Sequence, residues 1–384
     1  MKILNKIIDL IELEELLKSK YSSIIMPVNG IKAEFFIIPS IIQTLATLDR
    51  NCDFKYMINF THKDQYEKHV FNEIGFPLIS YFWKKGIFNK KGEGIKYELR
   101  EFTKKYYDEL NSKYYASKGN SVTIASYDHF PAKKGLDKIF YDQAGELIKN
   151  DFLIRNNCQK IFERVLRMNR EYKKVIGLLY DDLTTIIWEL FKNTHDHAKT
   201  DRNGSPLVRN IRGVHCKFYR IRKSEFNTKK YSNKNLKKYL EDPFHIEGNN
   251  FSSFFEISVF DAGPGFIQRN LNSEKKSIST DTQVEIIKRC LTKNQGSVKG
   301  AQGELKGFGL DYVLRCLGKK GYLRIRTEEI CVTRNMVLNP YAAEDKNNDI
   351  VLYDWVTNSK NKFTKHPKIT GSTVSIIYPL KSHE

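Results

Sequence analysis

Apolar residues in the first third of the chain alternate between short continuous runs and helical spacing. Strands are predicted at "SIIMPV", "EFFII" and "FKYMINF", and a helix at 41–48, where apolar residues recur on one helical face. A further helix, "DQYEKHVFNEIGFPLI", is predicted to end at Gly75. We therefore predict a small α/β domain over residues 1–115, followed by a polar linker or peripheral helix within 85–120.

The remaining sequence shows longer patterns. Helices are predicted over about 137–171 and 175–198, and at "GLDYVLRCLG". Strands are predicted at "SVTIASY", "RGVHCKFYRIR", "FFEISVFDAG", "GYLRIRTEEICVTRN" and "GSTVSIIYPL". This order of elements predicts a second domain at 121–384 and an α/β (α+β) fold class overall.

Composition narrows the class of protein. The chain has 384 residues, 40% of them hydrophobic and 28% charged, which is ordinary for globular proteins. The longest apolar runs are far shorter than the roughly 20 residues of a membrane helix. Acidic residues break the apolar run at the N-terminus, which predicts an amphipathic helix and not a signal peptide, so we expect a cytoplasmic protein. The six cysteines form no Cys-x-x-Cys pair, which argues against a zinc module and favours buried free thiols.

The positive charge is concentrated in one segment. The formal net charge is +19, and residues 199–238 contain thirteen Lys or Arg against two acidic residues. The core of this segment, "KKYSNKNLKK", lacks apolar periodicity, so we predict an exposed basic insertion at about 223–250. Nucleic acid or an acidic protein surface is the partner that such a charge favours, and a merely solubilising surface is the alternative.

The stretch "WELFKNTHDHAKT" is rich in residues that carry chemistry. On a helical wheel Glu189, Asn193 and Asp196 share one edge of a helix whose apolar stripe is buried. His195 and His197 diverge too far to hold one ion, and His195 is expected to face solvent. A carboxylate can accept a proton from water, and an amide oxygen suits Mg²⁺, so this edge is a candidate for both tasks.

Two glycine-rich segments follow. In "DAGPGF" a carboxylate at a strand end could accept a hydrogen bond from an exocyclic amine such as that of adenine, although a plain β-turn has the same pattern. In "GSVKGAQGELKGFGLDYV" four glycines within ten positions, Gly300, Gly303, Gly307 and Gly309, precede a helix that begins near Leu310, an arrangement that offers N–H groups to phosphates. Lys299 and Lys306 could add charge at a γ-phosphate or could be ordinary solvated lysines. The Walker pattern is absent because no Gly-Lys-Ser/Thr follows.

The motifs "ELFKNTHDHA", "DAGPGF", "KGFGLDYVL" and "GSTVSIIYPL", in this order, resemble the N box and glycine boxes of the GHKL superfamily. This superfamily includes gyrase, the heat-shock chaperone, histidine kinases and mismatch-repair ATPases. The resemblance covers about residues 121–380 and implies a Bergerat fold, in which helices cover one face of an antiparallel or mixed sheet. The element order of the first domain is loosely similar to that of STAS-type regulatory domains.

The resemblance also implies roles for individual residues. Glu189 would be the general base, Asn193 would bind Mg²⁺, Asp261 would contact the adenine amine, and Thr373 would lie near the base. The other residues expected to contact the nucleotide are Asp196, Gly263, Gly265, Lys299, Gly303, Lys306, Gly307, Phe308, Gly309 and Leu310.

An Mg²⁺-dependent ATP-driven switch or ATPase that regulates a protein partner is the function we expect, with bacterial stress or anti-phage defence as its setting. The alternatives are a soluble protein kinase acting on Ser, Thr or His, a nucleic-acid-handling ATPase that uses the basic insertion, and nucleotide binding without turnover. A sensor histidine kinase is disfavoured because neither a membrane span nor a His-containing dimerisation motif is found. A second copy of the same chain, forming a homodimer, is a further candidate partner.

Overall fold

The N-terminal part of the computed structural model contains a four-stranded parallel sheet with the order β1-β2-β3-β4. The structure describes the chain except residues 20, 33, 61, 114–118, 202, 229–232, 246–249, 271–277, 293–308, 342–349 and 382–384. The strands are β1 (Lys2–Ile3), β2 (Ser23–Met26), β3 (Lys55–Ile58) and β4 (Ile87–Asn89). The helices of this part, which we call the N-terminal unit, are α1 (Leu10–Ser19), α2 (Ile37–Asn51), α3 (Asp64–Val70), α4 (Gly75–Phe82) and α5 (Lys96–Lys113).

Two predictions for the N-terminal unit are wrong. The run "EFFII" leads into helix α2 and is not a strand: Ile37 and Ile38 form the first turn of α2, which is buried on all sides from Ile37 to Asp49. Gly75 begins α4 and does not end a helix. A Cβ at this position would lie 1.7 Å from the carbonyl oxygen of His69, so glycine is needed for close packing of the two helices.

The larger sheet has seven strands, all antiparallel, in the order β10-β9-β8-β11-β7-β6-β5. The strands are β5 (Ser121–Ser126), β6 (Arg212–Arg222), β7 (Phe251–Asp261), β8 (Tyr322–Glu328), β9 (Ile330–Asn335), β10 (Tyr353–Asp354) and β11 (Ile369–Pro379). The protein is therefore a mixed α/β structure with one parallel and one antiparallel sheet, as the predicted α+β class requires.

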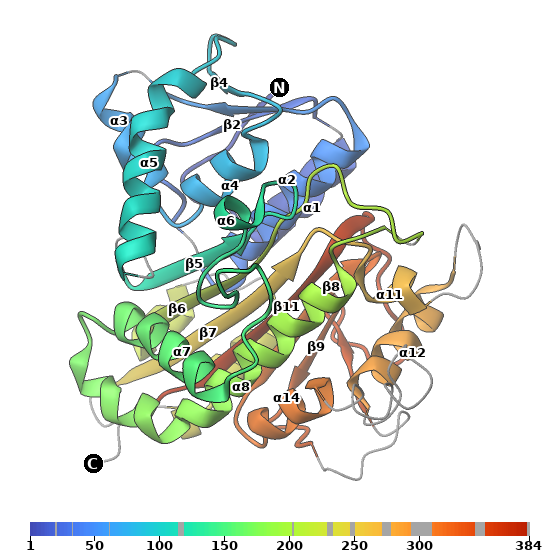
Figure 1. Cartoon of the computed structure of the whole chain (residues 1–384). Helices are drawn as coiled ribbons and strands as arrows, with labels where there is room; N and C mark the ends of the chain where they lie inside the picture. The colour runs from blue at the N-terminus through green and yellow to red at the C-terminus, as the bar shows by residue number, and fades with distance from the viewer. Residues whose placement is uncertain are drawn as a thin grey trace.

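Helices cover one face of the large sheet (Figure 1). They are α7 (Asp151–Val165), α8 (Lys173–His197), α11 (Gly265–Asn270), α12 (Thr280–Leu291) and α14 (Gly309–Leu317). The prediction of one helix over 137–171 is wrong. Asp137, Asp142 and Asn150 accept hydrogen bonds from backbone N–H groups two to four residues later, which favours turns over a helix before α7 begins.

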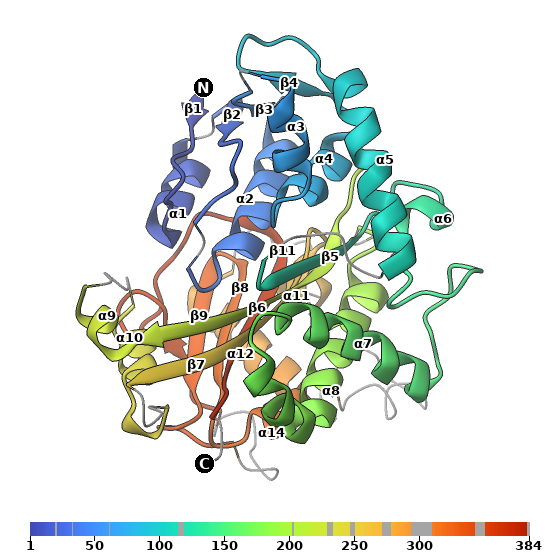
Figure 2. The same cartoon turned by 90° about the vertical axis from the view of Figure 1, so that its left-hand side faces the viewer.

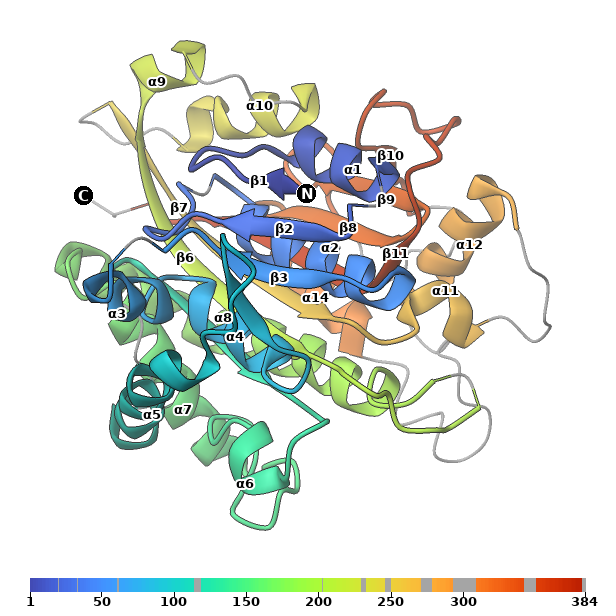
Figure 3. The ribbon, with the colours of Figure 1, turned by 90° about the horizontal axis from the view of Figure 1, so that it is seen from above.

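The opposite face of the large sheet is covered by the N-terminal unit, with α2 lying between the two sheets (Figures 2 and 3). Residues of both sheets and of α2 belong to one hydrophobic core, which includes Phe36, Ile41, Phe254 and Ile377. The large sheet is thus buried on both faces. No helix in the described residues is long and apolar enough to cross a membrane.

The basic insertion is more ordered than its composition predicts. It contains α9 (Lys223–Thr228), α10 (Lys234–Leu240) and a short 3-10 helix at Pro243–His245. Leu236, Tyr239 and Leu240 are buried, and the Tyr239 hydroxyl donates to the carbonyl oxygens of Lys320 (2.8 Å) and Ile377 (3.2 Å). Helix α10 is therefore packed against the large sheet, which corrects the expectation of a wholly exposed insertion. Short helices at Ala132–Gly135 (α6) and Arg170–Tyr172 complete the described elements.

Candidate functional site

The edge of α8 predicted to carry chemistry lies on the helix-covered side of the large sheet. Glu189 and Asn193 are half-buried, whereas Asp196 is exposed. Burial raises the pKa of the Glu189 carboxyl above its usual value, while the Lys192 charge opposes this shift and Asp196 adds to it. The amide nitrogen of Asn193 is buried and has no hydrogen-bond partner among the described residues. A half-buried carboxylate of raised basicity and an unsatisfied amide therefore share this edge.

Asp261 ends β7 and points toward the same side of the sheet as the inward-facing residues Val259 and Ile257. It is 7% exposed. Burial raises the pKa of Asp261 to about 6, against the backbone N–H groups of Gly263 and Ser372, which favour the ionised form. The Gly263 N–H donates to Asp261 Oδ1 at 2.8 Å. The strand end therefore holds a carboxylate in fixed orientation within a buried setting.

The turn after Asp261 packs directly against the C-terminal end of α8. A Cβ at Gly263 would lie 2.5 Å from the Cα and Cβ atoms of Ala198, so the turn and the helix end approach too closely for any other residue. Arg269 of α11 donates to the carbonyl oxygens of His197 (2.8 Å) and Thr200 (3.0 Å), which satisfies groups at the end of α8. These contacts bring the Asn193–Asp196 turn of α8 and the Asp261 turn to the same end of the sheet.

Two further glycines hold the neighbouring backbone segments together. Gly265 and Gly371 have φ values of +78° and +72°, which favour glycine. A Cβ at Gly265 would lie 2.8 Å from Thr327 Oγ1, and one at Gly371 would lie 2.0 Å from the carbonyl oxygen of Asp261. Gly263 and Gly265 of "DAGPGF" were predicted to contact the nucleotide. In the structure Gly263 and Gly265 are required by close packing of the chain itself.

Thr373 does not share the side of the sheet that Asp261 occupies. Its hydroxyl donates to Gln43 Oε1 of α2 at 2.8 Å, on the face covered by the N-terminal unit. The preceding residue, Ser372, faces the helix-covered side, where its Oγ accepts a hydrogen bond from the Phe266 N–H (3.2 Å). The expected position of Thr373 near an adenine is therefore wrong. Successive side chains of a strand point to opposite faces of the sheet. Val374 is buried under the helices, so Ser372, two residues earlier, presents its hydroxyl on the same side.

His195 differs from its prediction as a solvent-facing residue. It is half-buried, with Nδ1 2.8 Å from the Tyr141 hydroxyl and Nε2 3.0 Å from Lys199 Nζ. Burial lowers the pKa of His195 to about 4, and the charges of Lys199 and Arg212 add to the shift. The imidazole is therefore neutral near pH 7. Its neighbours show that it links α8 to the segment before α7.

The glycine-rich segment before α14 is described only from its end. Lys299, Gly303, Lys306, Gly307 and Phe308 lie outside the described residues. Gly309 and Leu310 form the first turn of α14, as predicted for a helix beginning near Leu310, and α14 packs along α8. The predicted phosphate-contacting loop thus leads into a helix that packs on α8.

Within the described ranges no group of three or more His, Cys, Asp or Glu side chains could hold a metal ion.

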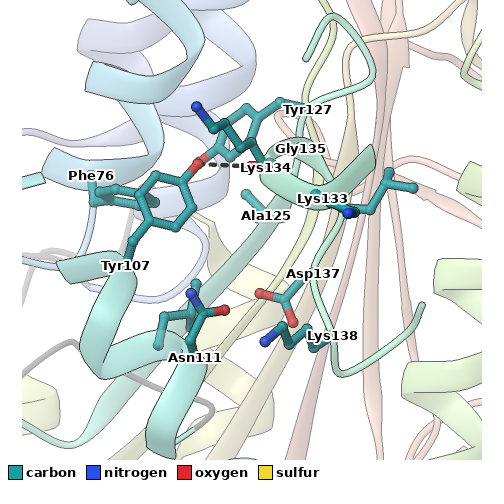
Figure 4. A pocket seen from close by; sticks show the side chains of 12 residues that line it. Phe76, Tyr107, Asn111, Ala125, Tyr127, Lys133, Lys134, Gly135, Asp137 and Lys138 are labelled. Atoms are coloured by element: carbon teal, nitrogen blue, oxygen red, sulfur yellow. Dashed lines mark hydrogen bonds between the residues drawn. The ribbon is translucent and has the colours of Figure 1, made fainter. Parts of the chain in front are cut away.

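A separate small cavity lies where α5 meets α6 (Figure 4). Its volume is about 30 Å³, enough for about two water molecules and too small for a nucleotide. The Tyr107 hydroxyl donates to the Lys134 carbonyl oxygen at 2.8 Å, and the carboxylate of Asp137 lies across the cavity from this bond. We regard this cavity as part of the packing between the N-terminal unit and β5.

Comparison with known proteins gives no match: no family model, no curated protein and no solved structure is similar to this chain.

Proposed function

We propose that the chain is a Mg²⁺-dependent ATP-binding protein of GHKL type, with residues 121–384 adopting a Bergerat fold. The observation that carries the proposal is the meeting of two motifs at one end of an antiparallel sheet, on its helix-covered side. There the Gly263 turn beside Asp261 packs on Ala198, directly after the α8 edge that holds Glu189 and Asn193. Asn193 and Asp261 are 68 positions apart in the sequence, and the resemblance requires their proximity.

Each residue has a role that its surroundings support. The Asp261 carboxylate, fixed by the Gly263 N–H, would accept a hydrogen bond from the adenine amine. Glu189, whose pKa is raised by burial, would accept a proton from the attacking water or hydroxyl. The Asn193 oxygen would hold magnesium, which would neutralise charge on the phosphates.

The biological activity we propose is that of an ATP-driven switch that regulates a protein partner. Helix α14 begins at Gly309, at the end of the glycine-rich segment, and packs along α8. Phosphate contacts to that segment would therefore change the position of α14 within the helix layer, and we propose that a partner binds there. A soluble protein kinase would use the same residues and differ only in the acceptor of the phosphoryl group.

One experiment separates these possibilities. The protein is incubated with γ-labelled ATP and Mg²⁺, and both free phosphate and labelled protein are followed. We expect ATP binding by calorimetry and release of free phosphate; transfer of the label to protein would favour the kinase. Asn193→Ala should weaken Mg²⁺-dependent binding, whereas Glu163→Ala, on the exposed side of α7, should leave it unchanged. No ATP binding by the wild type would refute the proposal.

Nucleic-acid handling is a second candidate, supported by the position of the basic insertion. Lys234 and Lys238 of α10 are exposed, and the Tyr239–Lys320 hydrogen bond places them beside a turn with exposed Lys319 and Lys320. Neutralising lysines 229, 230, 234, 237 and 238 should flatten the salt dependence of any nucleic-acid binding. If the wild type binds no nucleic acid at low salt, the insertion serves protein contacts or solubility.

A further inference from the structure

The segment 209–212, between α8 and β6, connects both halves of the candidate nucleotide site. Asn210 is fully buried, and its amide nitrogen donates to the carbonyl oxygen of Ala198 at 2.7 Å, at the C-terminal end of α8. The next carbonyl oxygen, that of Ile211, accepts a hydrogen bond from the Ala262 N–H at 3.0 Å, within the turn that follows Asp261. Two successive residues thus hold the end of α8 and the Asp261 turn.

Arg212 continues this connection into the sheet. It lies directly opposite Asp261 in the pairing of β6 with β7. Its guanidinium is fully buried and forms a bidentate ion pair with Asp128, with an Nε–Oδ2 distance of 2.8 Å and an Nη2–Oδ1 distance of 2.5 Å. Because such planar pairs restrict rotation and sliding, the segment has little freedom to shift relative to the chain after β5, while strand pairing holds Arg212 opposite Asp261.

The first residue of the segment is held by the N-terminal unit. Arg209 Nε donates to Asp49 Oδ2 at 2.7 Å, and Nη2 donates to Oδ1 at 3.1 Å. Asp49, on α2, is 1% exposed and also accepts hydrogen bonds from Lys85 (2.8 Å) and Tyr81 (3.1 Å). A buried carboxylate with several charge-assisted bonds is a rigid anchor, so the position of Arg209 is set by the N-terminal unit.

A second contact from α2 reaches the strand on the other side of Asp261. Gln43 accepts a hydrogen bond from the Thr373 hydroxyl (2.8 Å) and donates to the carbonyl oxygen of Thr370 (3.2 Å). Between these residues, Gly371 packs against the Asp261 backbone. Helix α2 therefore contacts both backbone segments that flank Asp261.

We propose that α2 positions the nucleotide site, with Asp49 acting through Arg209 as its principal positioning residue, so that nucleotide binding and docking of the N-terminal unit are coupled. This inference rests on the proposed function. It assigns the N-terminal unit a defined regulatory role: any signal that loosens α2 would release the segment 209–212 and misplace Asp261 relative to α8. By reciprocity, bound ATP would tighten the docking of α2.

The test compares Asp49→Asn with Glu73→Gln in the full-length protein. Glu73 forms an ion pair with Lys217 (2.9 Å) that also joins the N-terminal unit to the large sheet, but away from the segment 209–212. We expect Asp49→Asn to weaken ATP binding about fivefold or more, and Glu73→Gln to change it less than twofold. In a double-mutant cycle, Arg209→Gln should add little to Asp49→Asn, because the two residues act as one unit.

Amide hydrogen exchange without nucleotide supplies an independent readout. Asp49→Asn should accelerate exchange of the Ala262 N–H, whose acceptor is Ile211, and Glu73→Gln should not. Equal loss of affinity in both variants, or unchanged affinity and exchange in Asp49→Asn, would overturn the positioning role. If the wild type binds no ATP, the proposed function fails, and the exchange of Ala262 still decides whether Asp49 positions the turn.

Discussion

Replacing Asp261 by Asn should stabilise the folded protein at neutral pH while weakening ATP binding. Burial raises the pKa of Asp261 from 3.8 to about 6, so the folded state opposes ionisation. A shift of roughly two units corresponds to about 3 kcal/mol at pH 7, because each unit is worth about 1.4 kcal/mol. The Asn oxygen can still accept the Gly263 N–H, so the substitution removes the cost of the charge and keeps this hydrogen bond, while giving up the support of the Ser372 N–H for an ionised carboxylate.

The pH dependence has a definite sign. The folded state binds the proton of the Asp261 carboxyl more tightly than the unfolded state does. The free energy of unfolding of the wild type is therefore highest, as far as this group is concerned, below pH 4, and it falls as the pH rises through about 6. The advantage of Asp261→Asn should therefore appear in urea unfolding at pH 7 to 8 and vanish near pH 4. ATP affinity of the wild type should fall as the pH drops through about 6, because the adenine amine prefers an ionised acceptor.

Asp137→Asn is the matched control. Asp137 is also buried, burial raises its pKa to about 6, and it accepts a backbone hydrogen bond from Ile139 (2.9 Å), but it lies at the small cavity beside α5. Both variants should be stabilised at pH 7, and only Asp261→Asn should bind ATP about tenfold or more weakly. The reasoning is refuted if Asp261→Asn is destabilised while Asp137→Asn is stabilised, or if both bind ATP like the wild type.

Three further substitutions test the site. Glu189→Ala should retain ATP binding by calorimetry but lose phosphate release, and unchanged hydrolysis would exclude Glu189 as the general base. Gly263→Ala should lower the urea midpoint and the ATP affinity together, because its Cβ would meet Ala198 at 2.5 Å; a variant as stable as the wild type would contradict that packing. Ser372→Ala should affect ATP affinity more than Thr373→Val, since only Ser372 faces the Asp261 side; the reverse order would restore Thr373 to the site.

Most strands of the large sheet were predictable because their sequences leave few alternatives. The run "GYLRIRTEEICVTRN" was predicted as one strand and forms two, β8 and β9, and β10 was not predicted. The run "RGVHCKFYRIR" coincides with β6 over Arg212–Arg222, and β-branched and aromatic residues bounded by turn signals also identified β5, β7 and β11. Helix α8 was predictable from the spacing of its apolar residues. The same spacing placed Glu189 and Asn193 on one edge, although their roles remain predictions.

Local pattern could not predict elements whose form depends on distant partners. Helix α2 is buried between two sheets, so its first residues form a continuous apolar run, which is the pattern of a buried strand. Its first turn follows Phe36, which has a φ of 70° and whose N–H donates to the Glu256 carboxylate of β7 (3.2 Å). Arg209 and Asp49 meet across 160 residues and belong to no motif, so single-sequence reasoning had no signal for them.

Polar residues on the central strands explain why the two parts of the chain depend on each other. Val374 and Ile376 of β11 pack under the helices, whereas Thr373 and Ser375 face α2 together with Glu256 of β7. Buried polar groups need hydrogen-bond partners, and the N-terminal unit supplies one to Thr373 through Gln43 and one to Glu256 through the Phe36 N–H. Ser375 bonds instead to Ser258 of β7. Arg326 of β8, 1% exposed, pairs in the same way with Glu14 of α1 at 2.9 Å.

Strand β4 belongs to the four-stranded sheet and β5 to the seven-stranded sheet. This passage from one sheet to the other therefore does not divide the protein into two independent cores. If the segment 121–384 were alone, Arg326 would lose its ion pair with Glu14, Glu256 would lose the Phe36 N–H, and Arg209 would lose Asp49. The Asp261 turn and the end of α8 would then be joined only through a segment that is no longer anchored. The sheet face opposite the candidate nucleotide site is thus part of what forms that site, and this is why we place its regulation in α2.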